Sequence, residues 1–162
     1  MAGEIGGWPC RRTDDKSKTL AFDTLEHKSS VRAILQQLTS AARNGATTSL
    51  KVNGDRAVSI EEMIRAARAD DPLVASVLKQ AAEYLGRTIC QINLLLNPEQ
   101  FIIAGPLARL EDGFLKPTRE VVERLTPRLH GRVPQIEASQ FDEFGGALGA
   151  ATLALHNWSP AR

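Results

Sequence analysis

A carboxylate flanked by glycines stands near the start of the chain, in the sequence Gly3-Glu4-Ile5-Gly6-Gly7. Glycine has no side chain to keep a ligand away from the backbone, and a carboxylate accepts hydrogen bonds from hydroxyl groups. This combination suits a sugar better than a phosphate. The simpler alternative is a strand-to-loop turn that carries an exposed glutamate.

Two further glycine turns adjoin apolar segments. Ile103-Ala104-Gly105-Pro106 follows an apolar run typical of a buried strand, and Phe144-Gly145-Gly146-Ala147 precedes a segment of small residues. In an open α/β sheet, nucleotides bind at turns like these, at the carboxyl ends of strands and near helix N-termini. Close packing of a helix explains Gly145 and Gly146 about as well.

The other residue types that carry chemistry are scattered. His27, His130 and His156 are far apart in the sequence, and no pair has the spacing of metal ligands. Cys10 and Cys90 lack a C-x-x-C partner, which argues against a zinc site or a disulfide scaffold. No nucleophile elbow, Walker-type loop or catalytic carboxylate pair is present in the sequence. We therefore expect a ligand-binding protein with no metal site.

The spacing of apolar residues predicts the elements that position these turns. We expect a strand end and long loop over residues 1–24, helices over 25–43, 60–69, 72–96, 111–125 and 147–156, and strands over 101–104 and 135–138. For residues 46–58 we favour a loop over a small hairpin. Ser59 with Glu62 forms a capping box, and Asp71-Pro72 has the N-cap and first-turn proline of a strong helix start.

This order of elements predicts an α/β fold with a small sheet. Two clear strands leave sheet edges unpaired, so either the N-terminal segment contributes strands or another chain segment completes the sheet. The helix after Gly146 consists mainly of small residues, and we expect it to pack closely.

Composition excludes several classes of protein. The chain has 162 residues, 43% hydrophobic, with a formal net charge of +1, which indicates one globular domain. Strong nucleic-acid binding needs many basic contacts on one face, so it is not expected. No apolar run approaches the roughly 18 residues of a membrane span, and the N-terminus lacks the features of a signal peptide. We expect a cytoplasmic protein that does not interact with membranes.

The order of several motifs resembles the carboxyl-terminal half of the ROK family, the sugar kinases and sugar-responsive repressors. The motifs are Gly3-Glu4-Ile5-Gly6, Thr24-Leu25-Glu26, the stretch from Tyr84 to Gly105 and Gly145-Gly146-Ala147-Leu148-Gly149-Ala150-Ala151. The resemblance implies the second lobe of an actin-like ATPase (ribonuclease H-like) fold: a small mixed sheet with flanking helices, incomplete without the other lobe. Residues 1–162 would form this single lobe, with a strand and loop over 1–24, a helical part over 25–96 and an α/β part over 97–162.

By this resemblance, Glu4 and Glu26 are the carboxylates that bind sugar hydroxyls, with Gly6 and Gly7 beside them. The family has a zinc-ligating histidine where Gly7 stands, followed by a cysteine-rich zinc motif, but the segment from Trp8 to Thr24 offers Cys10 alone. Tetrahedral zinc needs about four ligands, so we expect the family's zinc to be absent.

The resemblance also implies an altered nucleotide site at Ala104, Gly105, Gly145 and Gly146. Pro106 interrupts the family's run of glycines, and proline removes a backbone donor. No segment matches the kinases' phosphate-binding loop, their catalytic aspartate or the repressors' winged helix-turn-helix. We expect no cofactor, and ATP only if the parent protein is a kinase.

Three functions remain open from the sequence. The first is a sugar-binding and dimerising lobe of a ROK-type transcriptional regulator, which would take a sugar or sugar phosphate, form a homodimer and reach DNA only through a separate domain. The second is the matching lobe of a sugar kinase, inactive by itself. The third is an interaction module that binds no ligand.

Overall fold

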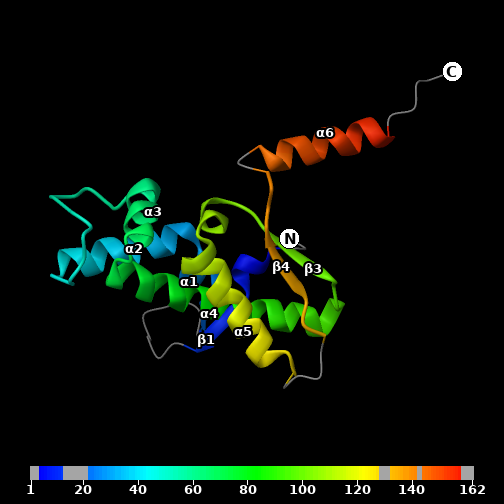
Figure 1. Ribbon diagram of the computed structural model, residues 1–162, viewed down its shortest axis with the longest axis horizontal. Helices are drawn as coiled ribbons and strands as arrows, with labels where there is room; N and C mark the ends of the chain where they lie inside the picture. The colour runs from blue at the N-terminus through cyan, green and yellow to red at the C-terminus, as the bar shows by residue number, and fades with distance from the viewer. Residues whose placement is uncertain (1–3, 13–21, 128–131, 142–143, 158–162) are drawn as a thin grey trace.

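The computed structural model describes residues 4–12, 22–127, 132–141 and 144–157 (Figure 1). Its elements in chain order are η1 (Ile5–Gly7), β1 (Pro9–Arg12), β2 (Phe22–Thr24), α1 (Leu25–Ser29), α2 (Val31–Arg43), α3 (Ile60–Arg68), α4 (Pro72–Leu96), β3 (Gln100–Ile103), η2 (Pro106–Arg109), η3 (Glu111–Leu115), α5 (Lys116–Leu125), β4 (Gln135–Ala138) and α6 (Gly145–Asn157). The predicted mixed α/β class is confirmed, and helices predominate.

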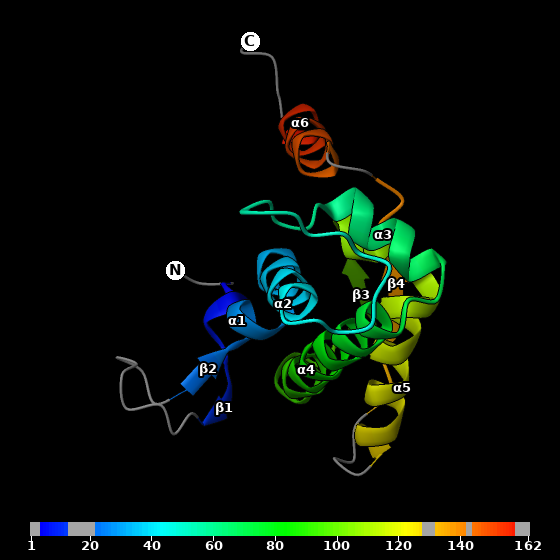
Figure 2. The same cartoon turned by 90° about the vertical axis from the view of Figure 1, so that its left-hand side faces the viewer.

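Helix α4 is the centre of the molecule, with α1 and α2 on one side of it and α5 on the other (Figure 2). In this helix Val74, Leu78, Ala81 and Ile89 are buried, whereas Leu96 at its end is 74% exposed. Around α4 lie side chains from the other helices, among them fully buried Leu38. The shorter helices α1, α2, α3 and α5 are therefore positioned by their contacts with α4.

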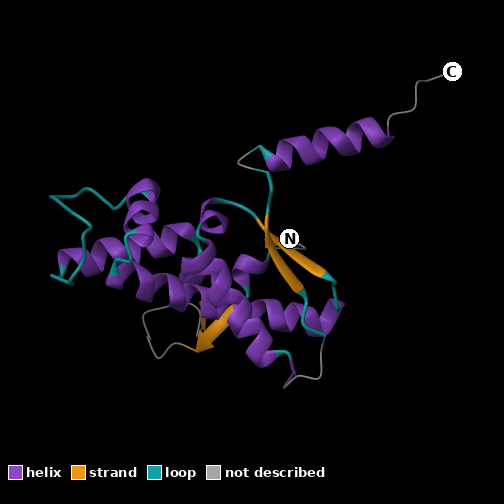
Figure 3. Ribbon diagram, viewed as in Figure 1, coloured by secondary structure: helices purple, strands orange, loops and turns teal. Residues whose placement is uncertain are grey.

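Two small sheets flank the helices. Their strands are coloured orange in Figure 3. Strands β1 and β2 pair antiparallel, and β3 and β4 pair parallel, with Gln100 opposite Gln135 and Ile103 opposite Ala138. The predicted strand over 135–138 is confirmed, and that over 101–104 begins and ends one residue earlier. The N-terminal segment does contribute strands, but they form a separate sheet, so β3 and β4 remain a pair.

Several predicted boundaries were wrong. The helix expected over 25–43 is interrupted at Ser30, whose backbone is extended and whose hydroxyl accepts a hydrogen bond from the Ala33 N–H. The helix expected over 111–125 begins as a π-helical turn, and α5 starts only at Lys116. Residues 46–58 form a loop, so the alternative of a small hairpin is excluded.

Both predicted helix starts are confirmed. Ser59 and Glu62 each accept a hydrogen bond from the other's backbone N–H. Asp71 accepts hydrogen bonds from Leu73 N and Val74 N at the start of α4. These side chains satisfy donors that a helix N-terminus leaves free.

Helix α6 extends away from the rest of the molecule (Figure 1). We predicted close packing through its small residues, and this was wrong for the described residues: Leu148, Leu153 and Leu155 are 51%, 63% and 75% exposed. A side chain at Gly149 would meet no atom within 4 Å. The reason is that no other described element lies against this helix.

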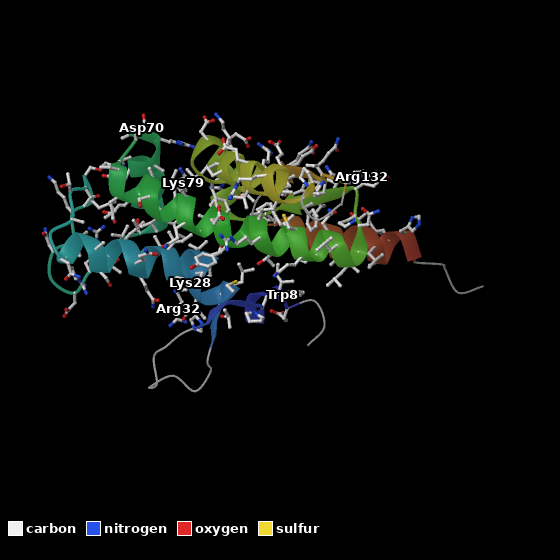
Figure 4. The ribbon with its side chains drawn as sticks, turned by 90° about the horizontal axis from the view of Figure 1, so that it is seen from below. Trp8, Lys28, Arg32, Asp70, Lys79 and Arg132 are labelled. Atoms are coloured by element: carbon white, nitrogen blue, oxygen red, sulfur yellow. The ribbon has the colours of Figure 1, made fainter. Side chains whose placement is uncertain are left out.

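Charged side chains lie on both sides of the helical layer. Figure 4 shows Lys28 and Arg32 on the side that carries Trp8, and Asp70 and Arg132 on the opposite side. No helix of the described chain is long and apolar enough to cross a membrane. His130 and residues 13–21, part of the segment compared with the family's zinc motif, lie outside the described residues.

Candidate functional site

A cavity of about 310 Å³ opens between the N-terminal segment, α1 and the end of β3. Gly6, Glu26 and Ala104 are among the residues that line it. The structure therefore brings together three predicted ligand-binding residues that are far apart in the sequence. Ser29, Ser30 and apolar side chains complete the lining. Sequence analysis did not select the two serines, although an adjacent pair of N-cap residues is a signal for a break in a helix.

Glu26 is held at the cavity by the way α1 is anchored. Leu25, next to it, is buried and donates its N–H to the Trp8 carbonyl at 2.9 Å. Ser29, at the end of α1, donates its hydroxyl to the Ala81 carbonyl of α4 at 3.0 Å. These contacts tie both ends of the short helix, which holds Glu26 in the cavity lining.

Gly6 leaves room for the Glu26 carboxylate. A Cβ at Gly6 would lie 3.0 Å from Glu26 Oε2, closer than ordinary van der Waals contact. A side chain at Gly6 would therefore push the carboxylate aside. Among the described residues that line this cavity, Glu26 is the charged one. A carboxylate among described lining residues that include no cation suits hydroxyl donors better than a phosphate.

Glu4 and Gly7 are exposed at the two ends of η1 and do not line the cavity. Glu4 precedes η1, and its side chain makes no capping hydrogen bond there. Glu4 is two residues before Gly6, which does line the cavity. Its predicted contact with a sugar stays a prediction.

The four residues predicted for a nucleotide do not share one cavity. Gly105, with φ of 93°, lines a second cavity of about 400 Å³ together with Ser139 and Gln140, which follow β4. Ala104 lines the first cavity instead. Gly145 and Gly146 belong to α6 and line neither. The positive φ at Gly105 is a conformation that glycine adopts without strain.

The described N-terminal segment does not fit the family's zinc. Cys10 lies in β1 with its Sγ 3.5 Å from the Trp8 carbonyl, and burial raises the pKa of this thiol, which disfavours the thiolate that binds metal. No cluster of three or more histidine, cysteine, aspartate or glutamate residues suited to a metal occurs in the described part of the chain. We derive no role for zinc here.

Comparison with known proteins identifies the family. The model of the ROK family matches residues 1–157, nearly the whole chain. The chain belongs to the ROK family. A curated relative, the glucokinase of Halalkalibacterium halodurans, is 29% identical over 133 residues, which cover 76% of this chain and 38% of that protein. The chain thus spans well under two thirds of this relative's length.

Solved ROK structures have the same fold. A ROK family transcriptional regulator, a homologue of the Escherichia coli MLC protein, matches with a TM-score of 0.73 and 24% identity over 91% of this chain and 37% of its own. The ROK glucokinase of Streptomyces griseus, in complex with glucose and AMPPNP, matches with a TM-score of 0.68 and 23% identity over 85% of this chain and 46% of its own. The predicted actin-like ATPase fold of the ROK proteins is thereby confirmed.

Proposed function

We propose that this chain is the sugar-binding and dimerising lobe of a ROK-type transcriptional regulator. The observation that carries the proposal is the Glu26 carboxylate, which lies beside Gly6 in the lining of a cavity of about 310 Å³. This volume is at the lower end of the roughly 300–1,000 Å³ of small-molecule sites. A carboxylate there accepts hydrogen bonds from a polyol, and the described lining residues include no cation to bind a phosphate.

Two departures from the family's pattern support binding without phosphate transfer. Gly7 replaces a histidine of the sugar site, and Pro106, the first residue of η2, interrupts the glycine run of the nucleotide site. A binding role tolerates these changes more readily than a catalytic role. In this proposal, DNA contact belongs to a separate domain, and the protein acts in the cytoplasm as a homodimer.

A second candidate is the corresponding lobe of a sugar kinase. The 29% identity to a glucokinase favours it, as does the cavity at Gly105, which follows β3. The two candidates differ in nucleotide binding, because a regulator needs only the sugar. An ATP analogue therefore separates them.

Isothermal calorimetry of the chain against hexoses, N-acetylated hexosamines, their 6-phosphates and an ATP analogue tests the proposal. We expect heat from an unphosphorylated sugar and none from the ATP analogue. Glu26→Gln and Glu4→Ala should each weaken sugar binding at least about tenfold, since a hydrogen bond to a charged group contributes about 1.5–3 kcal/mol. Glu137→Gln, at an exposed site on β4, is the matched control. Full sugar affinity in both variants, or no response to any sugar, would refute the proposed site.

The missing zinc ligands in the N-terminal segment also predict the zinc content of the purified chain. We expect the purified chain to contain well below one equivalent of zinc, because Cys10 is the cysteine available there and Gly7 cannot be a ligand. Elemental analysis after dialysis against a weak chelator measures this. A stoichiometric content that falls on Cys10→Ser substitution would contradict the expectation.

A further inference from the structure

The segment that carries Glu26 lies outside the apolar core. In the described part of the chain, residues 4–12 and 22–29 supply no member of either apolar cluster, although Leu25 is buried. Helix α1 has five residues, and a helix this short has little stability of its own in water. Contacts between polar groups therefore have a large part in keeping α1 in place.

The start of α1 has no side-chain cap. Thr24 directly precedes the helix, yet its hydroxyl makes no capping hydrogen bond and lies 3.0 Å from His27 Nδ1 instead. A side-chain oxygen at this position normally accepts a hydrogen bond from a free N–H of the first turn. The position of α1, and with it that of Glu26, thus depends on contacts with other elements.

An ion pair joins α1 to β2. Lys28 Nζ lies 2.8 Å from Asp23 Oδ2 of β2, on the side of the molecule that carries Trp8 (Figure 4). Asp23 is 7% exposed, and the Lys28 side chain is 27% exposed. Salt screens a partly buried pair less than it screens a surface pair. A buried carboxylate also needs compensation, because an uncompensated buried charge is strongly destabilising.

The ion pair and the Ser29 hydrogen bond connect α1 to different elements. Ser29 joins α1 to the Ala81 carbonyl of α4, whereas Lys28 joins it to β2. Contacts with two separate elements determine the direction of a short helix as well as its place. Loss of the ion pair should let α1 turn while Ser29 still holds it, which moves Glu26 without unfolding the chain.

We propose that Asp23 and Lys28 are positioning residues for Glu26, and that they hold its helix without a metal ion. The described N-terminal segment does not fit the family's zinc, so a contact of another kind has to fix α1 there. The consequence for ligand binding rests on the proposed function, in which Glu26 accepts hydrogen bonds from a sugar.

Lys28→Met tests the proposal, because methionine keeps the apolar part of the side chain and removes its charge. Amide hydrogen exchange, followed by NMR without any sugar, reports on the Leu25 N–H, which donates to the Trp8 carbonyl at 2.9 Å. We expect this amide to exchange at least about tenfold faster in Lys28→Met through local opening, while the Leu78 amide in α4 keeps its rate. General destabilisation would speed the exchange of both amides.

Sugar affinity gives a second measurement. Calorimetry with glucose and with N-acetylglucosamine should show affinity at least about tenfold weaker in Lys28→Met, since a binding group has to be held within about 0.5 Å of its working position. Lys28→Arg keeps the charge and should restore both the affinity and the slow Leu25 exchange. Lys79→Met, at an exposed site on α4, is the matched control and should change neither.

The two measurements fail separately. An unsubstituted chain that binds neither sugar would count against the sugar site, and Leu25 exchange would still decide whether the ion pair positions α1. EDTA should leave Leu25 exchange in the unsubstituted chain unchanged, because no metal holds α1. Unchanged Leu25 exchange in Lys28→Met, no rescue by Lys28→Arg, or faster exchange with EDTA would overturn the proposal.

Discussion

Replacing Gly86 by alanine should destabilise the protein by about 2 kcal/mol, although alanine is the better helix former. Gly86 lies buried in α4, where α5 crosses it. A Cβ there would lie 2.7 Å from both Cβ and Cγ1 of Val121 and 3.1 Å from the Thr118 carbonyl oxygen. These atoms belong to or adjoin the α5 backbone, so no change of rotamer relieves the contact and the helices must separate.

The size of this effect is the difference between two opposing contributions. Overpacking of a core costs about 1–3 kcal/mol and sometimes more, and the two approaches of 2.7 Å put Gly86→Ala at the upper end of this range. The higher helix propensity of alanine returns about 1 kcal/mol. Urea denaturation measures the free energy of unfolding directly, and a loss of 2 kcal/mol corresponds to a fall in melting temperature of about 4–8 °C for a chain of this size.

Gly113→Ala is the matched control for Gly86→Ala. A Cβ at Gly113 would lie 3.6 Å from Leu78 Cδ1, which is ordinary van der Waals contact. We expect a change in unfolding free energy within about 0.5 kcal/mol there, as for substitutions without a specific steric cause. Equal effects of the two substitutions would show that the approach of α5 to α4 is not what requires Gly86.

Periodicity predicted most of the fold because the helices bury continuous apolar faces. The helix over 72–96 and the strand over 135–138 have the predicted bounds. The break at Ser30 was missed because the apolar spacing continues across it, from Leu25 through Val31 to Ile34. Propensity alone could not decide between a continuous helix and a serine that caps a new one.

The candidate site depends on contacts that the sequence does not encode locally. The family motifs selected Gly6, Glu26 and Ala104, and the structure places all three on one cavity. That meeting requires α1 to be held against α4 by the Ser29 hydroxyl, a contact between residues 52 positions apart. The exposure of α6 and the free edge of β3 likewise follow from which elements are neighbours in space, which periodicity cannot predict.

Asp71 is a second residue whose contacts the sequence pattern does not predict, and its substitution is expected to have the second large effect on stability. The sequence identifies it as the N-cap of α4, but the structure adds hydrogen bonds from the 48–50 loop: Thr48 donates its hydroxyl at 2.9 Å, and Ser49 donates its N–H at 2.6 Å and its hydroxyl at 2.8 Å. Asp71 is only 4% exposed. Its carboxylate therefore joins the loop to the helix start.

Lowering the pH should remove the stabilisation that the Asp71 carboxylate provides. Burial raises the pKa of Asp71, but the hydrogen bonds from the Ser49 and Val74 N–H groups and from the Ser49 and Thr48 hydroxyls outweigh it and lower the pKa to about 2, from 3.8. Because the folded-state pKa is the lower one, the stabilisation is complete above the unfolded-state pKa and is lost as the pH falls from about 4 through 2. A shift of this size corresponds to about 2–3 kcal/mol.

We therefore expect Asp71→Asn to lower the free energy of unfolding by about 2–3 kcal/mol at pH 7, since the amide presents an NH₂ group to donors that need an acceptor. The difference from the unsubstituted chain should shrink as the pH falls below 4, because protonation of Asp71 then removes the same charge. Urea denaturation at a series of pH values measures both. Asp55→Asn, in an exposed turn, should show no such dependence. A difference that stays constant from pH 7 to pH 2 would mean that the hydrogen bonds to Asp71 do not depend on its charge.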